Sequence, residues 1–401
     1  MRILEINKFY FIKGGAERHF FDLIDLLRDN NNEVAVFSMK HSRNKKTKWE
    51  RYFLSTVGYN NGYTIWQKIK GVGRMFYSPE AKKKINKILD DFQPEVVHIH
   101  NIYHQLSPTI LFEIKKRNIP IVMTVHDYKL VNPNYNLYHK NKFYNRCLNE
   151  NFYQCFFDKC VKNSYLKSLM GALEMYWHKW LGTYEKNIDQ YIVPSEFAKS
   201  ILVERGLNKN KIKVLPHFIS QKSAIENNSS NIAKKEKIEE YCLYVGRVIS
   251  NKGIKRLVNI FSKIKGLKLY LAGEMDPGFN KSENKNVRYL GHLNQEKLKK
   301  YIKNSEFIIS PSQLPETFGL IALEANIHGK PFVGYKTGAY PEIIQEKKNG
   351  FLFDTEKELV NFLSDFREFN FDTSKQIEKN TIDRYNNLEY YKAFKDILNN
   401  F

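Results

Sequence analysis

Short apolar runs alternate with segments whose apolar residues recur at helical spacing, and this alternation constrains the fold more than any other feature. In the first half, the apolar runs are residues 2–7, 33–38, 96–100, 121–125, 191–194 and 211–216. Alternating strands and amphipathic helices are typical of βαβ units, whose strands run parallel. A polar stretch at 221–240 interrupts the pattern, which resumes at 241–245. The sequence therefore predicts an α/β protein with two Rossmann-like domains.

The length of 401 residues also favours two domains, and a hydrophobic content of 42% supplies the cores. We expect one domain over residues 1–218 and a second over 219–383. Apolar residues recur at helical spacing in the last segment, so we expect a C-terminal helix over 384–401 that packs back on the first domain.

The chain is strongly basic, with a net charge of +21 that is spread over both halves. This charge predicts a polyanionic partner, which could be nucleic acid, an anionic lipid surface or a phosphorylated substrate. The first residues lack the pattern of a signal peptide, and no run of 18 apolar residues occurs. Four cysteines do not indicate a disulfide scaffold. We expect a cytoplasmic protein whose contact with a membrane is at most peripheral.

A pair of glycines, Gly14 and Gly15, stands between the first strand and the first helix. Glycines in such a turn can bring bare N–H groups to an anion. The pair is not the dinucleotide-binding fingerprint, so from these residues alone a tight structural turn is the favoured interpretation.

The stretch 310–329 places Glu316 and Glu324 on either side of a turn into an apolar helix that begins near Gly319. Unpaired N–H groups at the start of that helix would suit a diphosphate, and the carboxylates would accept hydrogen bonds from sugar hydroxyls. A capped amphipathic helix with two solvated acids is the alternative.

Cationic residues also follow a predicted strand in the second half. Gly246 and Arg247 come directly after the strand 241–245, and Lys252 precedes the next helix. In doubly wound sheets ligands bind beyond the carboxyl ends of strands, so these charges could neutralise a diphosphate. In the first half, His126 stands at a comparable strand end. A solvated basic turn and a structural histidine are the respective alternatives.

Three further stretches allow two interpretations each. Cys147, Cys155 and Cys160, with His139 nearby, would be either packing thiols, which we expect, or an irregular zinc site. The basic stretch 39–87 would be either a solvated helical insert, which we expect, or a membrane-facing one. The apolar positions of 169–184 predict a helix that faces the core or lies in a membrane interface, and we expect the core.

Taken together, the order of the motifs resembles glycosyltransferase family 4, a group of retaining, nucleotide-sugar-dependent enzymes with the GT-B fold. The resemblance covers most of the chain and rests on short motifs in a fixed order: Gly14-Gly15-Ala16-Glu17, Thr124-Val125-His126-Asp127-Tyr128, Val193-Pro194-Ser195-Glu196-Phe197, Gly246-Arg247 with Lys252-Gly253, Ser310-Pro311-Ser312, Glu316-Thr317-Phe318-Gly319 through Glu324-Ala325, Gly338 with Pro341-Glu342, and Asn349-Gly350.

This resemblance implies two facing Rossmann-like domains, an acceptor-side one and a nucleotide-sugar-binding one, and it implies roles for individual residues. Arg247 and Lys252 would neutralise the diphosphate. Glu324 would bind the ribose, Glu316 the donor sugar, and His126 would lie beside the reacting carbon. The catalytic set would be His126, Glu316, Arg247 and Lys252. The remaining nucleotide-sugar contacts would be Gly14, Gly15, Gly246, Leu293, Phe318, Gly319, Leu320 and Glu324. No cofactor or metal is implied.

The implied activity is transfer of a hexose from a UDP- or GDP-linked sugar to a lipid-diphosphate-linked glycan, in capsule, O-antigen or related envelope synthesis. The enzyme would contact the inner face of an anionic membrane and would bind no nucleic acid. Two alternatives stay open: a nucleotide-sugar 2-epimerase on the same architecture, and an inactive transferase fold that binds membrane or nucleic acid.

Overall fold

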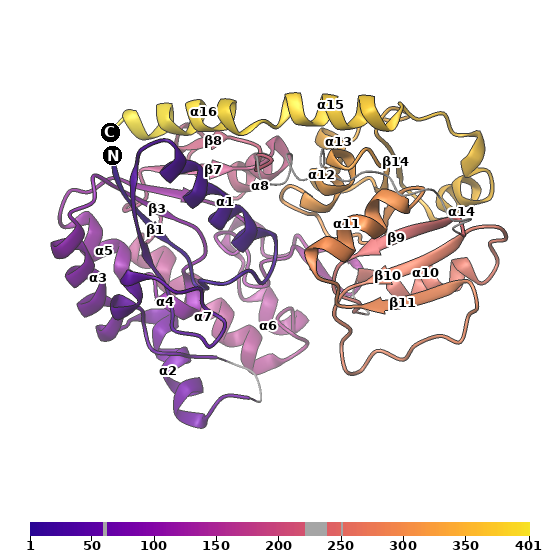
Figure 1. The fold of residues 1–401 in the computed structure, drawn as a ribbon. Helices are drawn as coiled ribbons and strands as arrows, with labels where there is room; N and C mark the ends of the chain where they lie inside the picture. Colours follow the sequence, from indigo (N-terminus) through magenta and orange to yellow (C-terminus); the bar gives the residue numbers. More distant parts are fainter. Residues whose placement is uncertain (59–61, 221–238, 250–251) are drawn as a thin grey trace. The chain divides into compact units, whose positions relative to one another are not determined.

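The computed structural model describes residues 1–58, 62–220, 239–249 and 252–401, so the linker expected at 221–240 lies almost entirely outside the described residues. The chain forms two compact units (Figure 1). Unit 1 comprises Met1–Leu137, Tyr144–Phe218 and Asn387–Phe401, and unit 2 comprises Tyr138–Phe143 and Ile219–Asn386.

Unit 1 is built on a parallel six-stranded sheet in the order β2-β1-β3-β4-β7-β8. Each strand is short, and its central residues are buried. The strands are β1 (Arg2–Ile6), β2 (Glu33–Phe37), β3 (Val96–Ile99), β4 (Ile121–Thr124), β7 (Gln190–Val193) and β8 (Ile212–Val214).

Apolar clusters cover both faces of this sheet because successive side chains of a strand point to opposite faces. Leu4 and Ile6 belong to one cluster, and Ile3 belongs to the other. The helices of the unit are α1 (Gly15–Asp29), α2 (Ile65–Phe76), α3 (Pro79–Phe92), α4 (Tyr103–Leu106), α5 (Thr109–Lys115), α6 (Gln154–Asp158), α7 (Tyr165–Leu181), α8 (Glu196–Glu204) and α16 (Asn387–Asn399).

Unit 2 repeats this plan with a second parallel six-stranded sheet in the order β11-β10-β9-β12-β13-β14. Its strands are β9 (Tyr241–Val245), β10 (Lys268–Ala272), β11 (Val287–Gly291), β12 (Ile308–Ser310), β13 (Phe332–Tyr335) and β14 (Gly350–Phe353). Its helices are α10 (Ile254–Phe261), α11 (Gln295–Asn304), α12 (Leu320–Ile327), α13 (Tyr340–Ile343), α14 (Glu356–Ser364) and α15 (Ser374–Arg384). A small hairpin of β5 (Tyr138–His139) and β6 (Lys142–Phe143) also belongs to this unit. Two parallel sheets confirm the predicted fold class.

The C-terminal segment forms two helices rather than one, and they belong to different units. Helix α15 ends at Arg384 in unit 2, and α16 returns to unit 1, where it packs on α1. The side chain of Asn32 donates a hydrogen bond to the Tyr391 hydroxyl at 3.1 Å, and Phe394 is fully buried. The C-terminal helix thus completes the first unit.

The prediction that residues 169–184 face the core is wrong for most of their large side chains. Leu173 is 47% exposed and Trp180 is 76% exposed, and Leu169, Tyr176 and Trp177 are also exposed. The buried side of α7 consists instead mostly of small or polar residues, Ser168, Gly171, Ala172, Glu174 and His178, with Met175 as its one large apolar residue. The predicted helix is present, but most of its large apolar side chains point to solvent.

The three thiols of the loop after β6 also differ from the expectation of free packing thiols. Cys155 and Cys160 form a disulfide, whereas Cys147 is a buried free thiol. His139 lies in the hairpin of unit 2. Among the described residues, the cysteines belong to no group of potential metal ligands.

Candidate functional site

Each sheet has one point where the strand order reverses. In unit 1 the chain runs from β1 outward to β2 and then resumes with β3 on the other side of β1. In unit 2 the corresponding reversal lies between β9 and β12. The crevice beyond the carboxyl ends of such a strand pair is where doubly wound sheets bind ligands.

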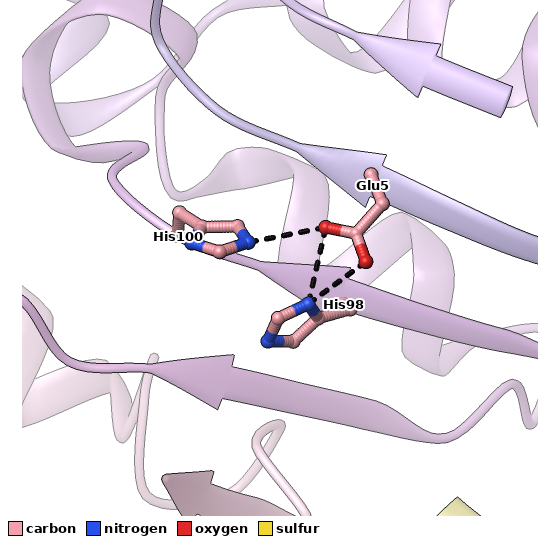
Figure 2. Close-up of side chains that lie close together, drawn as sticks. All are labelled: Glu5, His98 and His100. Carbon is pink, nitrogen blue, oxygen red and sulfur yellow. Dashed lines mark hydrogen bonds and ion pairs between the residues drawn. The ribbon is translucent and has the colours of Figure 1, made fainter. Parts of the chain in front are cut away.

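At the reversal of unit 1, polar side chains replace apolar ones toward the carboxyl ends of the strands. On a single face, Ile3 is followed by Glu5 in β1, and Val96 is followed by His98 in β3. Glu5, His98 and His100 are all fully buried. Figure 2 shows both imidazoles pointing at the one carboxylate.

The carboxylate of Glu5 holds both rings by hydrogen bonds. The Nδ1 atom of His98 lies 2.9 and 3.0 Å from the two oxygens of Glu5, and Nε2 of His100 lies 3.1 Å from Oε2 (Figure 2). Because a carboxylate only accepts hydrogen bonds, both nitrogens must be the protonated ones. The other nitrogen of His98 then accepts a hydrogen bond from the Thr124 hydroxyl at 2.8 Å.

This network extends to the predicted residue His126. Nδ1 of His100 lies 2.8 Å from Nε2 of His126. Since Nε2 of a neutral His100 carries the proton toward Glu5, its Nδ1 is an acceptor and Nε2 of His126 must donate. A chain of hydrogen bonds therefore runs from the buried carboxylate to the partly exposed His126, and it assigns the proton of that ring to Nε2.

Lowered pKa values keep the rings of His100 and His126 neutral. The pKa values of His100 and His126 lie well below 6.5, first because burial disfavours the charged rings and then because neighbouring histidines repel the charge. Burial, with the repulsion of His217 next, lowers the pKa of His19 in the same way. The rings of His19 and His217 lie 3.9 Å apart, and His19 lies 5.7 Å from His126.

The first turn of α1 belongs to the same end of the sheet. Helix α1 begins at Gly15, and Gly14 and Gly15 are both exposed, while His19 one turn later is buried among the histidines. The structure thus brings the predicted glycine pair and the predicted His126 to one edge of unit 1.

Glu5, His98 and His100 also form the one group of potential metal ligands found among the described residues, with ligand atoms within 4.8 Å of one another. In the hydrogen-bond network, both histidine nitrogens that face the carboxylate carry a proton. An ion at this position would have to displace those two protons, so the donor set fits a hydrogen-bond network better than a cation site.

At the reversal of unit 2, the turn after β9 places Arg247 at the strand end. The Tyr244 hydroxyl donates a hydrogen bond to the Arg247 carbonyl at 2.9 Å, and the Arg247 side chain is exposed. Gly246 lies so close to Gly273 that a Cβ atom at Gly273 would meet the Gly246 oxygen at 1.8 Å. The tight backbone contact fixes the turn from which the guanidinium projects.

Glu316 approaches from the neighbouring strand β12. Its carbonyl accepts a hydrogen bond from Ala339 N–H at 3.0 Å, and a Cβ atom at Gly338 would lie 2.5 Å from its backbone nitrogen and oxygen. Burial raises the pKa values of the Tyr244 and Tyr340 phenols, and the negative charge of Glu316 raises them further. Glu316, in the loop that leaves β12, therefore lies near Tyr244 of β9 and Tyr340 of α13.

The helix predicted after Gly319 is α12, and Gly319 is its N-cap with φ 96°. A side chain at Gly319 would meet the Tyr340 ring at 2.5 Å, so glycine is required by both conformation and space. Glu324 is partly exposed on the second turn of α12.

The other predicted residues of unit 2 are Lys252, which precedes α10, and Leu293, Phe318 and Leu320. Lys252 is partly exposed, and a Cβ atom at the following Gly253 would lie 2.6 Å from the Pro311 carbonyl. Ser250 and Asn251 of the same loop lie outside the described residues. Leu293 follows the edge strand β11 and packs against the apolar cluster that also contains Phe318 and Leu320.

Sequence reasoning missed Glu5, His98 and His100, although a signal for them was available. The alternation Val96-Val97-His98-Ile99-His100 places both histidines on one face of a strand, and Glu5 occupies the same face of the first strand. The parallel pairing of Glu5 with His98 then brings the side chains together.

The two parallel sheets define a doubly wound α/β protein of two units, and comparison with known families identifies the class to which it belongs. The family description "Glycosyltransferase Family 4" matches residues 13–222, and "Glycosyl transferases group 1" matches residues 225–384. The chain therefore belongs to glycosyltransferase family 4.

Several relatives come from bacterial envelope loci. Two uncharacterised proteins in the cps region of Klebsiella pneumoniae are similar: one is 31% identical over 43% of this chain and 49% of its own length, and the other is 23% identical over 86% and 87%. The lipopolysaccharide 1,2-N-acetylglucosaminetransferase of Salmonella typhimurium is 25% identical over 41% of this chain and 49% of its own. Two of these alignments thus span about half of the relative.

Solved structures of low identity share the fold over the whole chain. A lipopolysaccharide outer core galactosyltransferase has a TM-score of 0.64 at 16% identity and full coverage of both chains. The Anabaena HepE protein, solved in complex with UDP-glucose, has a TM-score of 0.62 at 15% identity, again with full coverage of both chains. The architecture of two parallel six-stranded sheets and a C-terminal helix is that of the GT-B fold.

Proposed function

We propose that this chain is a retaining transferase that moves a hexose from a UDP-sugar to a lipid-diphosphate-linked glycan during capsule or lipopolysaccharide synthesis. The observation that carries the proposal is that Arg247 and Glu316 both lie near Tyr244, beyond the ends of the neighbouring strands β9 and β12 at the strand reversal of unit 2. The relatives in capsule and lipopolysaccharide synthesis support the pathway, and the UDP-glucose complex of a structural neighbour supports the base.

In this proposal Arg247 and Lys252 neutralise the diphosphate as the bond to the sugar breaks. Fixed positive charges stabilise the leaving group most where they need no reorganisation, and the Arg247 turn is held by the Gly246–Gly273 contact. The N–H groups at the start of α12 would receive phosphate oxygens, Glu316 would hold sugar hydroxyls, and Glu324 the ribose. No step in this scheme needs a metal.

His126 is proposed to lie beside the donor sugar. Its proton is assigned to Nε2 and points to His100, so the hydrogen bond to His100 fixes the orientation of the ring. In a retaining reaction without a covalent intermediate, the departing phosphate takes the proton of the acceptor hydroxyl, and His126 then acts by orientation rather than as a general base.

Donor hydrolysis tests the proposal. The purified protein is incubated with UDP-, GDP- and ADP-sugars, and release of the nucleotide is measured for the native chain, Glu316→Gln and the matched variant Glu296→Gln, whose carboxylate is exposed on α11. We expect the native chain to hydrolyse a UDP-sugar. The rate should fall by about tenfold or more in Glu316→Gln, because a hydrogen bond to a charged group is lost, and it should be unchanged in Glu296→Gln.

Failure of every nucleotide sugar to bind or turn over would contradict the proposal. Inversion of the sugar at carbon 2 with no hydrolysis or transfer would instead identify an epimerase.

A further inference from the structure

Helix α2 buries its arginine against the protein and turns several large apolar residues toward solvent. Arg74 is 1% exposed, whereas Ile65, Trp66 and Ile69 are exposed, Trp66 by 76%. A surface helix of a globular protein normally has the opposite orientation, with the apolar stripe on the core. Burying a guanidinium is costly unless it is paired, so the orientation requires specific partners.

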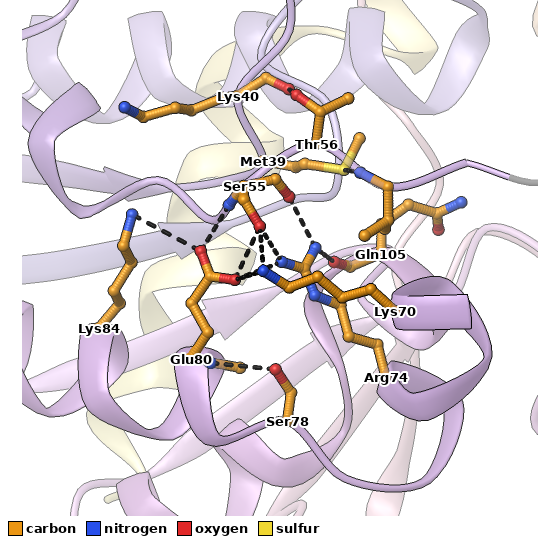
Figure 3. Close-up of polar contacts among 12 residues, drawn as sticks. Met39, Lys40, Ser55, Thr56, Lys70, Arg74, Ser78, Glu80, Lys84 and Gln105 are labelled. Carbon is orange, nitrogen blue, oxygen red and sulfur yellow. Dashed lines mark hydrogen bonds and ion pairs between the residues drawn. The ribbon is translucent and has the colours of Figure 1, made fainter. Parts of the chain in front are cut away.

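Those partners are present and hold α2 in place (Figure 3). The guanidinium of Arg74 donates to the Ser55 and Gln105 carbonyls at 2.8 and 2.9 Å and forms an ion pair with Glu80 at 2.7 Å. Glu80 also accepts from the Ser55 N–H at 2.7 Å, and Lys70 reaches the same carboxylate at 2.7 Å. The inward side of α2 therefore consists of this polar network around Arg74, together with the buried residues Gly71 and Met75, while Ile65, Trp66 and Ile69 are left outside.

Helix α7 has the same inverted orientation. Glu174 on its inward side is 1% exposed and forms ion pairs with Lys129 and His104, both at 2.8 Å. On its outward side Leu166, Leu173 and Trp180 are exposed. Two inverted helices in one unit are hard to explain by packing alone.

The two helices are joined directly. His178 of α7 lies 2.6 Å through Nε2 from the carbonyl of Met75 in α2, and the rings of Phe76 and Trp177 lie 6.1 Å apart. The exposed residues of both helices therefore form one surface, which we call the apolar face: Ile65, Trp66 and Ile69 of α2 with Leu166, Leu173 and Trp180 of α7.

The two helices that carry the apolar face have more basic than acidic residues, although Lys179 of α7 is paired with Glu150 and Glu185. Helix α2 contains no acidic residue, and the one acid of α7 is the buried Glu174. Lys167 is exposed beside Leu166, and Lys68 is partly exposed on α2. Tryptophan, leucine and lysine together are the residues of helices that lie in a membrane interface. Two copies of this face would oppose lysine to lysine, which disfavours a second copy as the occupant.

We propose that the apolar face docks on a bilayer surface that contains anionic lipids. The apolar side chains enter the boundary between head groups and acyl chains, while the lysines contact lipid phosphates. The inference rests on the proposed function in one respect: a lipid-linked acceptor would be presented at that surface. The docking itself needs no donor and no turnover.

Vesicle sedimentation tests the proposal with the full chain. The probes are vesicles of phosphatidylcholine alone and vesicles with about 30% phosphatidylglycerol, an anionic lipid at a level that attracts basic segments. We expect binding to the anionic vesicles that weakens in high salt, and much less binding to the neutral ones. The double variant Trp66→Ser/Trp180→Ser should bind about tenfold or more weakly, because each indole removes a large apolar area from water.

A matched double variant, Leu388→Ser/Val360→Ser, removes two exposed apolar residues that lie on other helices, and it should bind as the native chain does. Both variants should keep the native melting temperature, and donor hydrolysis without vesicles should be unchanged.

Absence of binding to the anionic vesicles, or equal binding by the two double variants, overturns the proposal. A native dimer that Trp66→Ser/Trp180→Ser dissociates also overturns it, because a second copy would then cover the face. Loss of hydrolysis with intact vesicle binding would contradict only the proposed function.

Discussion

Arg74 is a buried cation whose charge is balanced mainly by Glu80. Replacing Glu80 with glutamine keeps the shape but leaves the guanidinium without its anion. We expect Glu80→Gln to lower the free energy of unfolding by about 3 kcal/mol, as for other broken buried pairs. Glu196→Gln, at an exposed i,i+3 pair with Lys199, should change it by less than about 0.5 kcal/mol. Urea unfolding measures both, and equal stabilities would contradict the role given to Glu80.

The same pair predicts a pH dependence of stability. Burial by itself would raise the pKa of Glu80, but hydrogen bonds from Lys70 and Ser55 and the charge of Arg74 outweigh it and lower the pKa from 4.5 to about 2. Since the folded-state value lies below the unfolded one, the stabilisation is present above 4.5 and disappears as the pH falls toward about 2. Glu80→Gln should therefore lose less stability than the native chain between neutral pH and about pH 3. Parallel losses in the two proteins would refute this origin.

The hydrogen-bond chain from Glu5 to His126 makes a prediction about protons. His100 and His126 should both carry their proton on Nε2, which ¹⁵N NMR of labelled imidazoles measures directly. In Glu5→Gln, whose side chain can donate as well as accept, the preference at His100 and then at His126 should weaken. A proton on Nδ1 of His126 in the native protein would contradict the assignment, whatever the activity of the enzyme.

At the scale of elements, the strands and helices could be predicted because their apolar periods are local. What could not be predicted is the direction in which an apolar face points. The spacing of Leu169, Leu173 and Trp180 shows that α7 has an apolar side, but only the buried partners of Glu174 reveal that this side is turned outward. The contact between Glu5 and His98 likewise depends on the register in which β1 pairs with β3, and short sequence motifs do not specify that register.

The loop that carries Glu316 is positioned by Gly338, and this predicts a graded effect of alanine. Gly338 has φ +59°, and a Cβ atom there would collide with the backbone of Glu316. Gly206 also has a positive φ, +91°, but faces open space. Gly206→Ala should cost roughly 1 kcal/mol of stability from conformation alone, while Gly338→Ala should cost more. Only Gly338→Ala should also weaken UDP binding, and calorimetry that finds equal affinities for the two variants would rule out this positioning role.

At the scale of the whole molecule, the two sheets and the series of glycine, arginine and glutamate motifs were predictable because each motif follows a strand end. The residues His126 and Gly14 fall in unit 1, and Arg247, Lys252, Glu316 and Glu324 fall in unit 2, as the alternation of strands implied. No helix among the described residues is both long enough and apolar enough to cross a bilayer. The identity of the sugar depends on side-chain contacts with a donor, and no motif of the chain encodes it.

Titration of UDP into the native chain, Arg247→Ala and Arg288→Ala tests the central claim, which is that the strand reversal of unit 2 holds the donor diphosphate. Arg288 is an exposed arginine of the same unit, on the edge strand β11. We predict that calorimetry finds UDP binding to the native chain, unchanged binding to Arg288→Ala, and binding weaker by about tenfold or more to Arg247→Ala, since a hydrogen bond between charged groups is lost. No binding of UDP to the native chain, or equal affinities for all three proteins, would contradict the claim.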